Sequence, residues 1–160
     1  MESLEGLFEK EFKNLYALEK QMMGDLDKIE NVSQKKMIKY LNDYQDLSKK
    51  HYDKVKSMAQ DMSINPGNTI DSVANEMLKN VNDINSEELK QNIKEAGLLA
   101  SINRLTSYKS TCYENVLTMA RTLKKKKVSK HIRKMQKKND RLGSKFSKLA
   151  KTKIYKAALE

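Results

Sequence analysis

Hydrophobic residues recur along the chain every three or four positions, which is the spacing of one face of an α-helix and not of a strand. Polar residues fill the positions between them, so each helical segment has one apolar and one polar face. Five segments follow from this spacing, at about residues 4–29, 34–62, 70–84, 87–123 and 128–149. The pattern therefore predicts an all-α protein.

Turn-forming residues separate these segments. The stretch NVS at 31–33 ends the first helix, and Ser33 is a candidate N-cap for the second. SINPGNT at 63–69 contains the only proline and is the clearest break. Ser86 is a candidate N-cap for a helix whose first turn holds Glu87 and Glu88, and KKKK at 124–127 forms the last corner.

The long connection at 63–86 decides between bundle topologies. Antiparallel neighbours need only short loops, whereas a connection of this length can cross the whole bundle. One long crossover between two helix pairs is the topology of ferritin-like four-helix bundles. We therefore expect a single domain over residues 1–160, with the crossover carrying the short apolar helix that begins near Ile70.

Charge is distributed unevenly along the 160 residues, whose formal net charge is +11. Residues 121–156 hold 16 Lys or Arg and only one acid, Asp140, whereas residues 1–120 are slightly acidic. A single cysteine, Cys112, excludes an internal disulfide and fits a reducing cytoplasm. No apolar run is long enough for a transmembrane helix, and the acidic N-terminus lacks the features of a secretory signal.

The first helix carries a family resemblance. SLEGLFEKEFKNLYALEKQM resembles the opening of the YciE/YciF-type bacterial stress proteins, whose pattern is L-x-x-L-F-x-x-E-h-x-x-L-Y-x-A-E-K-Q-h with h apolar. Three weaker blocks follow in the same order, LSKKHYDKV, EAGLLASINRLTSYKSTCYENV and SKFSKLA. Together the blocks extend over nearly the whole chain. The resemblance implies a ferritin-like fold in which inward-facing Glu and His side chains hold two iron ions.

Most of the implied metal ligands are missing from this sequence. The resemblance places ligand positions at Glu19 and His51, which keep suitable side chains. It places the other positions at residues that cannot supply a carboxylate: Leu47, Thr106, Lys109 and Asn139. Asp46, next to Leu47, falls on the opposite face of its helix and is expected to contact water. Two iron ions need hard, anionic oxygen ligands, so the resemblance predicts a degenerate di-iron site with no cofactor.

Glu19 lies within the apolar stripe of the first helix, where a carboxylate needs a partner. It is either a surviving metal ligand or a buried acid satisfied by a cation and hydrogen bonds. The lysine at position 109 favours the second role, because an ammonium can stand where metal charge once stood. Tyr16, Tyr44, Tyr108 and His51 are candidates for further hydrogen bonds to this carboxylate.

The last helix has a broad basic side opposite its apolar stripe. Seven candidate polyanion-binding residues lie there: Lys130, Arg133, Lys134, Lys137, Arg141, Lys145 and Lys148. This side is either a solvated lysine-rich surface or a platform for phosphate groups. Because few aromatic residues are interleaved with the lysines, any binding of nucleic acid is expected to be independent of base sequence.

These observations predict a cytoplasmic protein that is not an enzyme, a stress- or interaction-type protein that forms homo-oligomers, with a dimer favoured. The first alternative is sequence-independent binding of nucleic acid or another polyanion through the basic helix. The second is residual metal binding or iron storage. The sequence contains no Gly-rich phosphate loop, no CxxC pair and no arrangement typical of a Ser-His-Asp triad.

Overall fold

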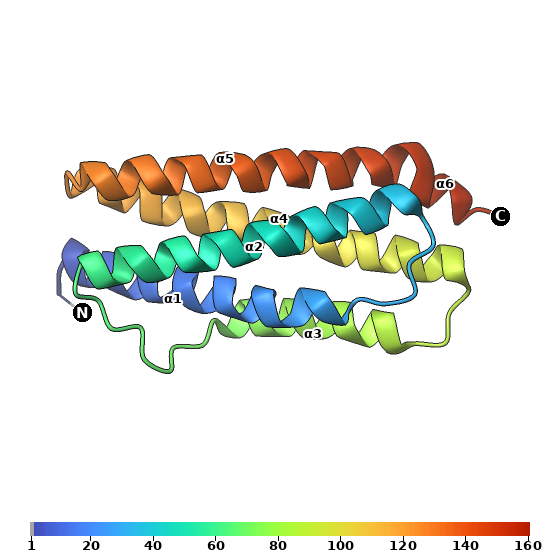
Figure 1. Cartoon of the computed structure of the whole chain (residues 1–160), viewed down its shortest axis with the longest axis horizontal. Coiled ribbons are helices and arrows are strands. Elements are labelled where there is room, and N and C mark those ends of the chain that lie inside the picture. Colours follow the sequence, from blue (N-terminus) through green and yellow to red (C-terminus); the bar gives the residue numbers. More distant parts are fainter. Residues whose placement is uncertain (1) are drawn as a thin grey trace.

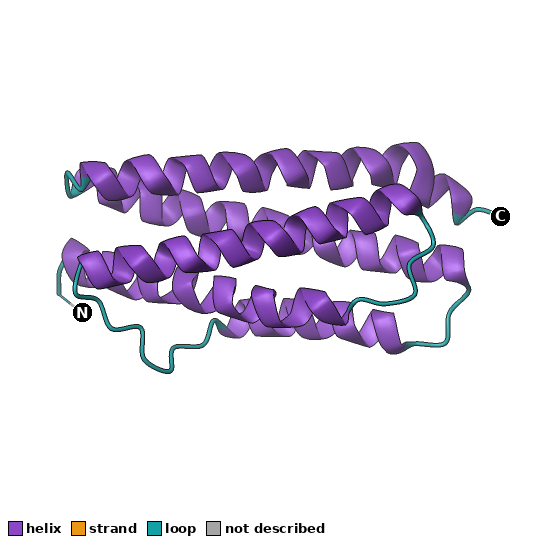
Figure 2. Ribbon diagram, in the orientation of Figure 1, coloured by secondary structure: helices purple, strands orange, loops and turns teal. Residues whose placement is uncertain are grey.

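The computed structural model describes residues 2–160, in which every regular element is helical (Figures 1 and 2). Four long helices form the bundle, namely α1 (Leu4–Asp25), α2 (Lys35–Asp61), α4 (Gln91–Thr122) and α5 (Lys126–Leu149). A fifth helix, α3 (Ser72–Ser86), lies along the outside. The remaining elements are a 3-10 turn at Leu26–Lys28, a π-helical turn at Ala150–Ile154 and the short α6 at Tyr155–Ala157. The predicted all-α fold is confirmed.

The bundle has one long crossover, as the connection at 63–86 predicts. α1 and α2 form one antiparallel pair, and α4 and α5 form the other (Figure 1). α1 also packs against α4, and α2 packs against α5, which closes the four-helix arrangement. The crossover carries α3 along the side of α1 and α4. This is the ferritin-like topology.

One hydrophobic core runs through the bundle because each long helix turns its apolar face inward. The apolar stripe predicted for the last helix is buried on α5, where it consists of Val128, Ile132, Met135, Leu142, Phe146 and Leu149. Burying a side chain of this size contributes about 1.5 to 3 kcal/mol relative to leaving it exposed. Within residues 2–160, no helix is both long and apolar enough to span a bilayer.

The predicted cap of α2 by Ser33 is wrong. Gln34 is the N-cap, and Ser33 instead donates two hydrogen bonds to Glu95 of α4, from its backbone N–H and from its hydroxyl. The Gln34 N–H and the Gln91 side chain donate to the same carboxylate oxygen. A carboxylate from α4 thus adds to the local cap by Gln34 and places negative charge at the positive end of α2.

Other element boundaries also differ from the sequence prediction. The α-helical part of α1 ends at Asp25, four residues early, because a 3-10 turn follows it. Ser86 ends α3 and does not cap α4, which begins at Gln91 after the exposed acids at 87 and 88. Ile70 lies outside α3 and is 68% exposed. Val73, in the first turn of α3, is 47% exposed.

Asp71 fastens the crossover to the bundle. Its carboxylate accepts a hydrogen bond from the Ala74 N–H, which caps α3, and a bifurcated bond from the Tyr108 hydroxyl of α4 at 2.9 and 3.0 Å. Its backbone N–H and carbonyl both bond to the side chain of Gln21 in α1. One residue therefore joins α3 to two helices of the bundle. Because the buried Asp71 is the N-cap, α3 begins at Ser72 and Ile70 lies outside it.

Candidate functional site in the bundle centre

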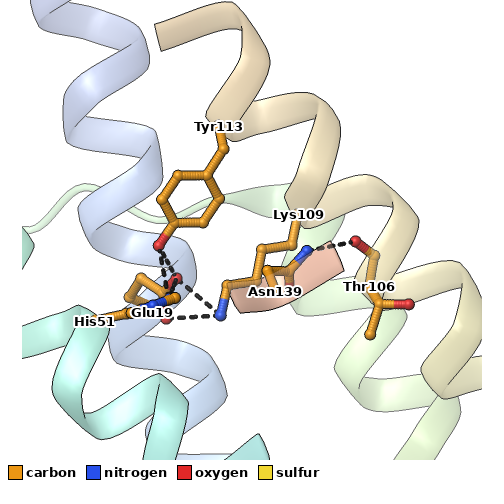
Figure 3. A network of polar contacts seen from close by, with 6 residues as sticks. All are labelled: Glu19, His51, Thr106, Lys109, Tyr113 and Asn139. Atoms are coloured by element: carbon orange, nitrogen blue, oxygen red, sulfur yellow. Dashed lines mark hydrogen bonds and ion pairs between the residues drawn. The ribbon is translucent and has the colours of Figure 1, made fainter. Parts of the chain in front are cut away.

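Glu19 and Lys109 form an ion pair in the centre of the bundle (Figure 3). The Lys109 ammonium lies 2.9 Å from Oε1 and 3.1 Å from Oε2 of the Glu19 carboxylate. Both side chains are completely shielded from solvent. Glu19 comes from α1 and Lys109 from α4, so the pair joins two helices that are not sequence neighbours. The inward orientation of Glu19 and its contact with Lys109 are confirmed.

Tyr113 and His51 complete the cluster. The Tyr113 hydroxyl donates to Glu19 Oε1 at 2.5 Å and lies 3.1 Å from His51 Nδ1. Because the Tyr113 proton is used for the carboxylate, its oxygen is free to accept a proton from Nδ1. This assigns the Nδ1–H tautomer to a neutral His51. Its Nε2 is buried and has no hydrogen-bond partner within residues 2–160.

The electrostatics of the cluster favour an ionised Glu19. Burial by itself raises the pKa of the Glu19 carboxyl, but the Lys109 ammonium, His51 and the Tyr113 hydroxyl together bring the pKa below its ordinary value. Burial lowers the pKa of Lys109, and the attraction to Glu19 opposes that shift. The pKa of His51 is lowered by burial, which keeps the imidazole neutral. The cluster is therefore an ion pair with no net charge, next to the uncharged side chains of His51 and Tyr113.

The other ligand positions implied by the resemblance do not converge on Glu19. Leu47 packs against the hydrophobic core, and Asp46 beside it is exposed as expected. Thr106 donates its hydroxyl proton to the Asn103 carbonyl, and its own carbonyl accepts from the Asn139 amide (Figure 3). Thr106 of α4 and Asn139 of α5 are thus hydrogen-bonded to each other.

The donor set does not fit a di-iron centre. Within the described part of the chain, no three side chains of His, Cys, Asp or Glu come close enough to hold a metal ion. The Glu19 oxygens, which would be metal ligands, are engaged by an ammonium and a hydroxyl. A cation next to the ligand oxygens repels a metal ion, and one carboxylate cannot balance two iron ions.

Three of the expected hydrogen-bond donors are not used at Glu19. The Tyr16 hydroxyl pairs with Tyr52 at 3.0 Å, and Tyr108 binds Asp71. The Tyr44 hydroxyl is buried without a partner within residues 2–160. The fourth expected donor, His51, lies beside the carboxylate, with Nδ1 3.6 Å from Oε1.

The donor that sequence reasoning missed is Tyr113. It lies four residues after Lys109, so both side chains project from the same face of α4. That spacing was the available signal.

The basic side of α5 is where the sequence predicts it. All seven candidate residues are exposed, and within residues 2–160 none of the seven is in an ion pair. Two lysines at the start of the same helix are paired instead, Lys125 with Glu5 at 2.7 Å and Lys127 with Asp61 at 2.9 Å.

Residues 3–159 match the model of a family described as a domain of unknown function, DUF892. The chain belongs to this family. The predicted relationship to YciE/YciF-type proteins is confirmed by this match together with a solved structure, that of the Escherichia coli stress protein YciF. YciF is 17% identical over 94% of this chain and 96% of its own, with a TM-score of 0.88. At this identity the likeness shows a shared fold within the family. A search of curated proteins finds no match.

Proposed function

We propose that this member of the family is a non-enzymatic, ferritin-like interaction protein in which a buried ion pair has replaced the di-iron centre. The observation that carries the proposal is the position of the Lys109 ammonium, within 3.1 Å of both Glu19 oxygens. An ammonium balances the carboxylate without any open coordination position. The cluster then stabilises one arrangement of the helices and has no site for substrate or oxygen.

We propose further that the protein works in the cytoplasm, belongs to a stress response and forms homo-oligomers, with a dimer favoured. Its fold likeness to YciF, described as a stress protein, supports a role in a stress response. Self-association would cover the exposed apolar side chains of Ile70 and Val73, three residues apart on the crossover. Sedimentation equilibrium tests the oligomer, and a monomer at micromolar concentration would contradict it.

Oxygen consumption after addition of Fe(II) tests the non-enzymatic assignment. We expect the rate with protein to equal the rate in buffer at every iron concentration. A saturable rate that disappears in the Glu19→Gln variant would show a working metal site and overturn the proposal. Glu114→Gln is a matched control on the exposed surface of α4.

A second candidate function is sequence-independent binding of nucleic acid through α5. The seven exposed, unpaired cations of this helix support it. Contacts with phosphates release counterions, so binding to duplex DNA should weaken with salt at a log–log slope of about −0.9 per phosphate contacted.

A combined variant tests this function. Neutralising Lys134, Lys137, Arg141 and Lys145 together should remove most of the affinity and leave the fold intact. No binding by the wild-type protein at low salt would leave the basic side as a solvated surface.

A further inference from the structure

The basic side of α5 borders a hollow of about 360 Å³ between α5 and the end of α4. Its lining includes five cationic side chains and Ser129: Arg121, Lys130, Arg133, Lys134 and Lys137. No Asp or Glu lines it. Arg121 is the only one of these cations that α4 supplies, and it was not among the candidates from the sequence.

We propose that this hollow binds a backbone phosphate of nucleic acid between Arg121 of α4 and the cations of α5. The proposal rests on the second proposed function and adds a specific site to it. Cations on two helices line the hollow, whereas Lys145 and Lys148, farther along α5, are exposed but do not line it. Converging cations surround a phosphate and lose less side-chain freedom in doing so than cations on an open helix face.

The local electrostatics support an anion at this position. His131, the residue after Lys130 on α5, has its pKa lowered by burial and by the surrounding lysines, among them Lys54, Lys127, Lys134 and Lys130. Within residues 2–160, none of the five cations that line the hollow is in an ion pair, whereas Lys127, on the other side of His131, is paired with Asp61. A hollow with this field attracts phosphate oxygens in preference to neutral groups.

An extended polyanion fits better than a small free anion. From Lys130 to Lys148 the exposed cations follow α5 for roughly 27 Å, at 1.5 Å per residue. A single phosphate would use only the hollow and leave the rest of this line unused. A membrane surface fits less well, because no large apolar side chain is exposed between 126 and 149.

The test uses fluorescence anisotropy with a mixed-sequence DNA duplex over a salt series. Arg121→Gln should weaken binding and reduce the magnitude of the log–log salt slope by about 1, as expected for the loss of one phosphate contact. Arg104→Gln is the matched control, because Arg104 is an exposed arginine on the same helix outside the hollow. It should leave both the affinity and the slope unchanged.

A second comparison separates the hollow from the rest of α5. Arg133→Gln with Lys137→Gln should cost more affinity than Lys145→Gln with Lys148→Gln, although both pairs remove two charges. Equal losses for the two pairs, together with unchanged binding by Arg121→Gln, would show that the hollow does not bind a phosphate. Binding through the exposed face of α5 would then remain as the explanation. No binding by the wild-type protein would overturn both.

Inorganic phosphate distinguishes a small-anion site from a nucleic-acid site. At matched ionic strength, millimolar phosphate should not displace the duplex. Displacement would show that the free anion is the preferred ligand and overturn the assignment to nucleic acid. Thermal unfolding of each variant, followed by circular dichroism, confirms that these exposed substitutions leave the fold intact.

Discussion

Lys109 lies 2.9 Å from Oε1 and 3.1 Å from Oε2 of Glu19, and neither side chain is reached by solvent. A buried pair of this kind adds little net stability compared with apolar residues of the same shape, because both charges lose their hydration. Removing one partner is costly, because the other charge is then buried alone. The pair therefore determines how α1 and α4 pack together. It also makes a single substitution at either position strongly destabilising.

A double-mutant cycle tests the pair. Glu19→Gln should lower the free energy of unfolding by about 3 to 5 kcal/mol, because it leaves the Lys109 ammonium buried without a counter-charge. Adding Lys109→Met should recover part of that loss, since no charge then remains. Urea unfolding of the four proteins gives the coupling energy. Additive effects of the two substitutions would show that the side chains do not stabilise each other.

Tyr113 should be the most sensitive tyrosine in the chain. Tyr113→Phe removes the hydroxyl that donates to Glu19 and faces His51, so we expect a loss of about 1 to 3 kcal/mol in unfolding free energy. Tyr40→Phe is the matched control, because the Tyr40 hydroxyl has no hydrogen bond within residues 2–160. It should change stability very little. Equal effects of the two substitutions would show that the Tyr113 hydroxyl does not stabilise the cluster.

The cap that Glu95 provides for α2 should make stability depend on pH. Burial raises the pKa of Glu95, but hydrogen bonds from Gln91, Ser33 and Gln34 bring it below its ordinary value of 4.5 overall. As the pH falls, the Glu95 carboxylate is therefore protonated at a higher pH in the unfolded chain than in the folded protein. The contribution is complete above pH 4.5 and is lost as the pH falls through the folded-state pKa.

The Glu95→Gln variant isolates this contribution. It should be less stable than the wild type at neutral pH and lose less stability between about pH 6 and about pH 3, because its amide does not titrate. Glu88→Gln, in the exposed loop before α4, should follow the wild-type curve. Unfolding by urea at a series of pH values gives these curves. A Glu95→Gln curve parallel to that of the wild type would contradict the trans-helix cap.

Asp71→Ala should loosen the crossover. It removes the cap of α3 and the partner of the Tyr108 hydroxyl, so we expect a loss of about 1 to 3 kcal/mol in unfolding free energy. Hydrogen exchange should show faster opening of α3 than of α4. Asp83→Ala, an exposed aspartate in the same helix, is the control. Unchanged exchange in α3 would mean that the apolar contacts of α3 alone hold the crossover.

Helical periodicity was sufficient to predict the helices and the crossover, because apolar residues every three or four positions leave few other arrangements. It failed at the helix ends, where contacts distant in sequence decide. Ser33 has the residue type of a local cap, yet it bonds to Glu95, 62 residues away. Asp71 has the residue type of an N-cap for α3, but its hydrogen bonds to Gln21 and Tyr108 cannot be read from the local sequence.

The centre of the site was predictable in part. Helical winding places Glu19 inside, and the family resemblance supplies position 109 as its neighbour. The choice among tyrosines failed, because several of them lie on inward faces and only the packed structure decides which hydroxyl reaches the carboxylate. Arg121 escaped detection for a related reason, since it approaches the α5 cations from another helix.

The iron content of the protein after loading tests the central claim most directly. Purified protein is incubated aerobically with Fe(II), dialysed against a chelator and analysed for metal, with Glu19→Gln treated in the same way. If the Lys109 ammonium has replaced the metal, both proteins should retain the same small, substoichiometric amount of iron. Stoichiometric iron in the wild type that is lost in Glu19→Gln would contradict the account.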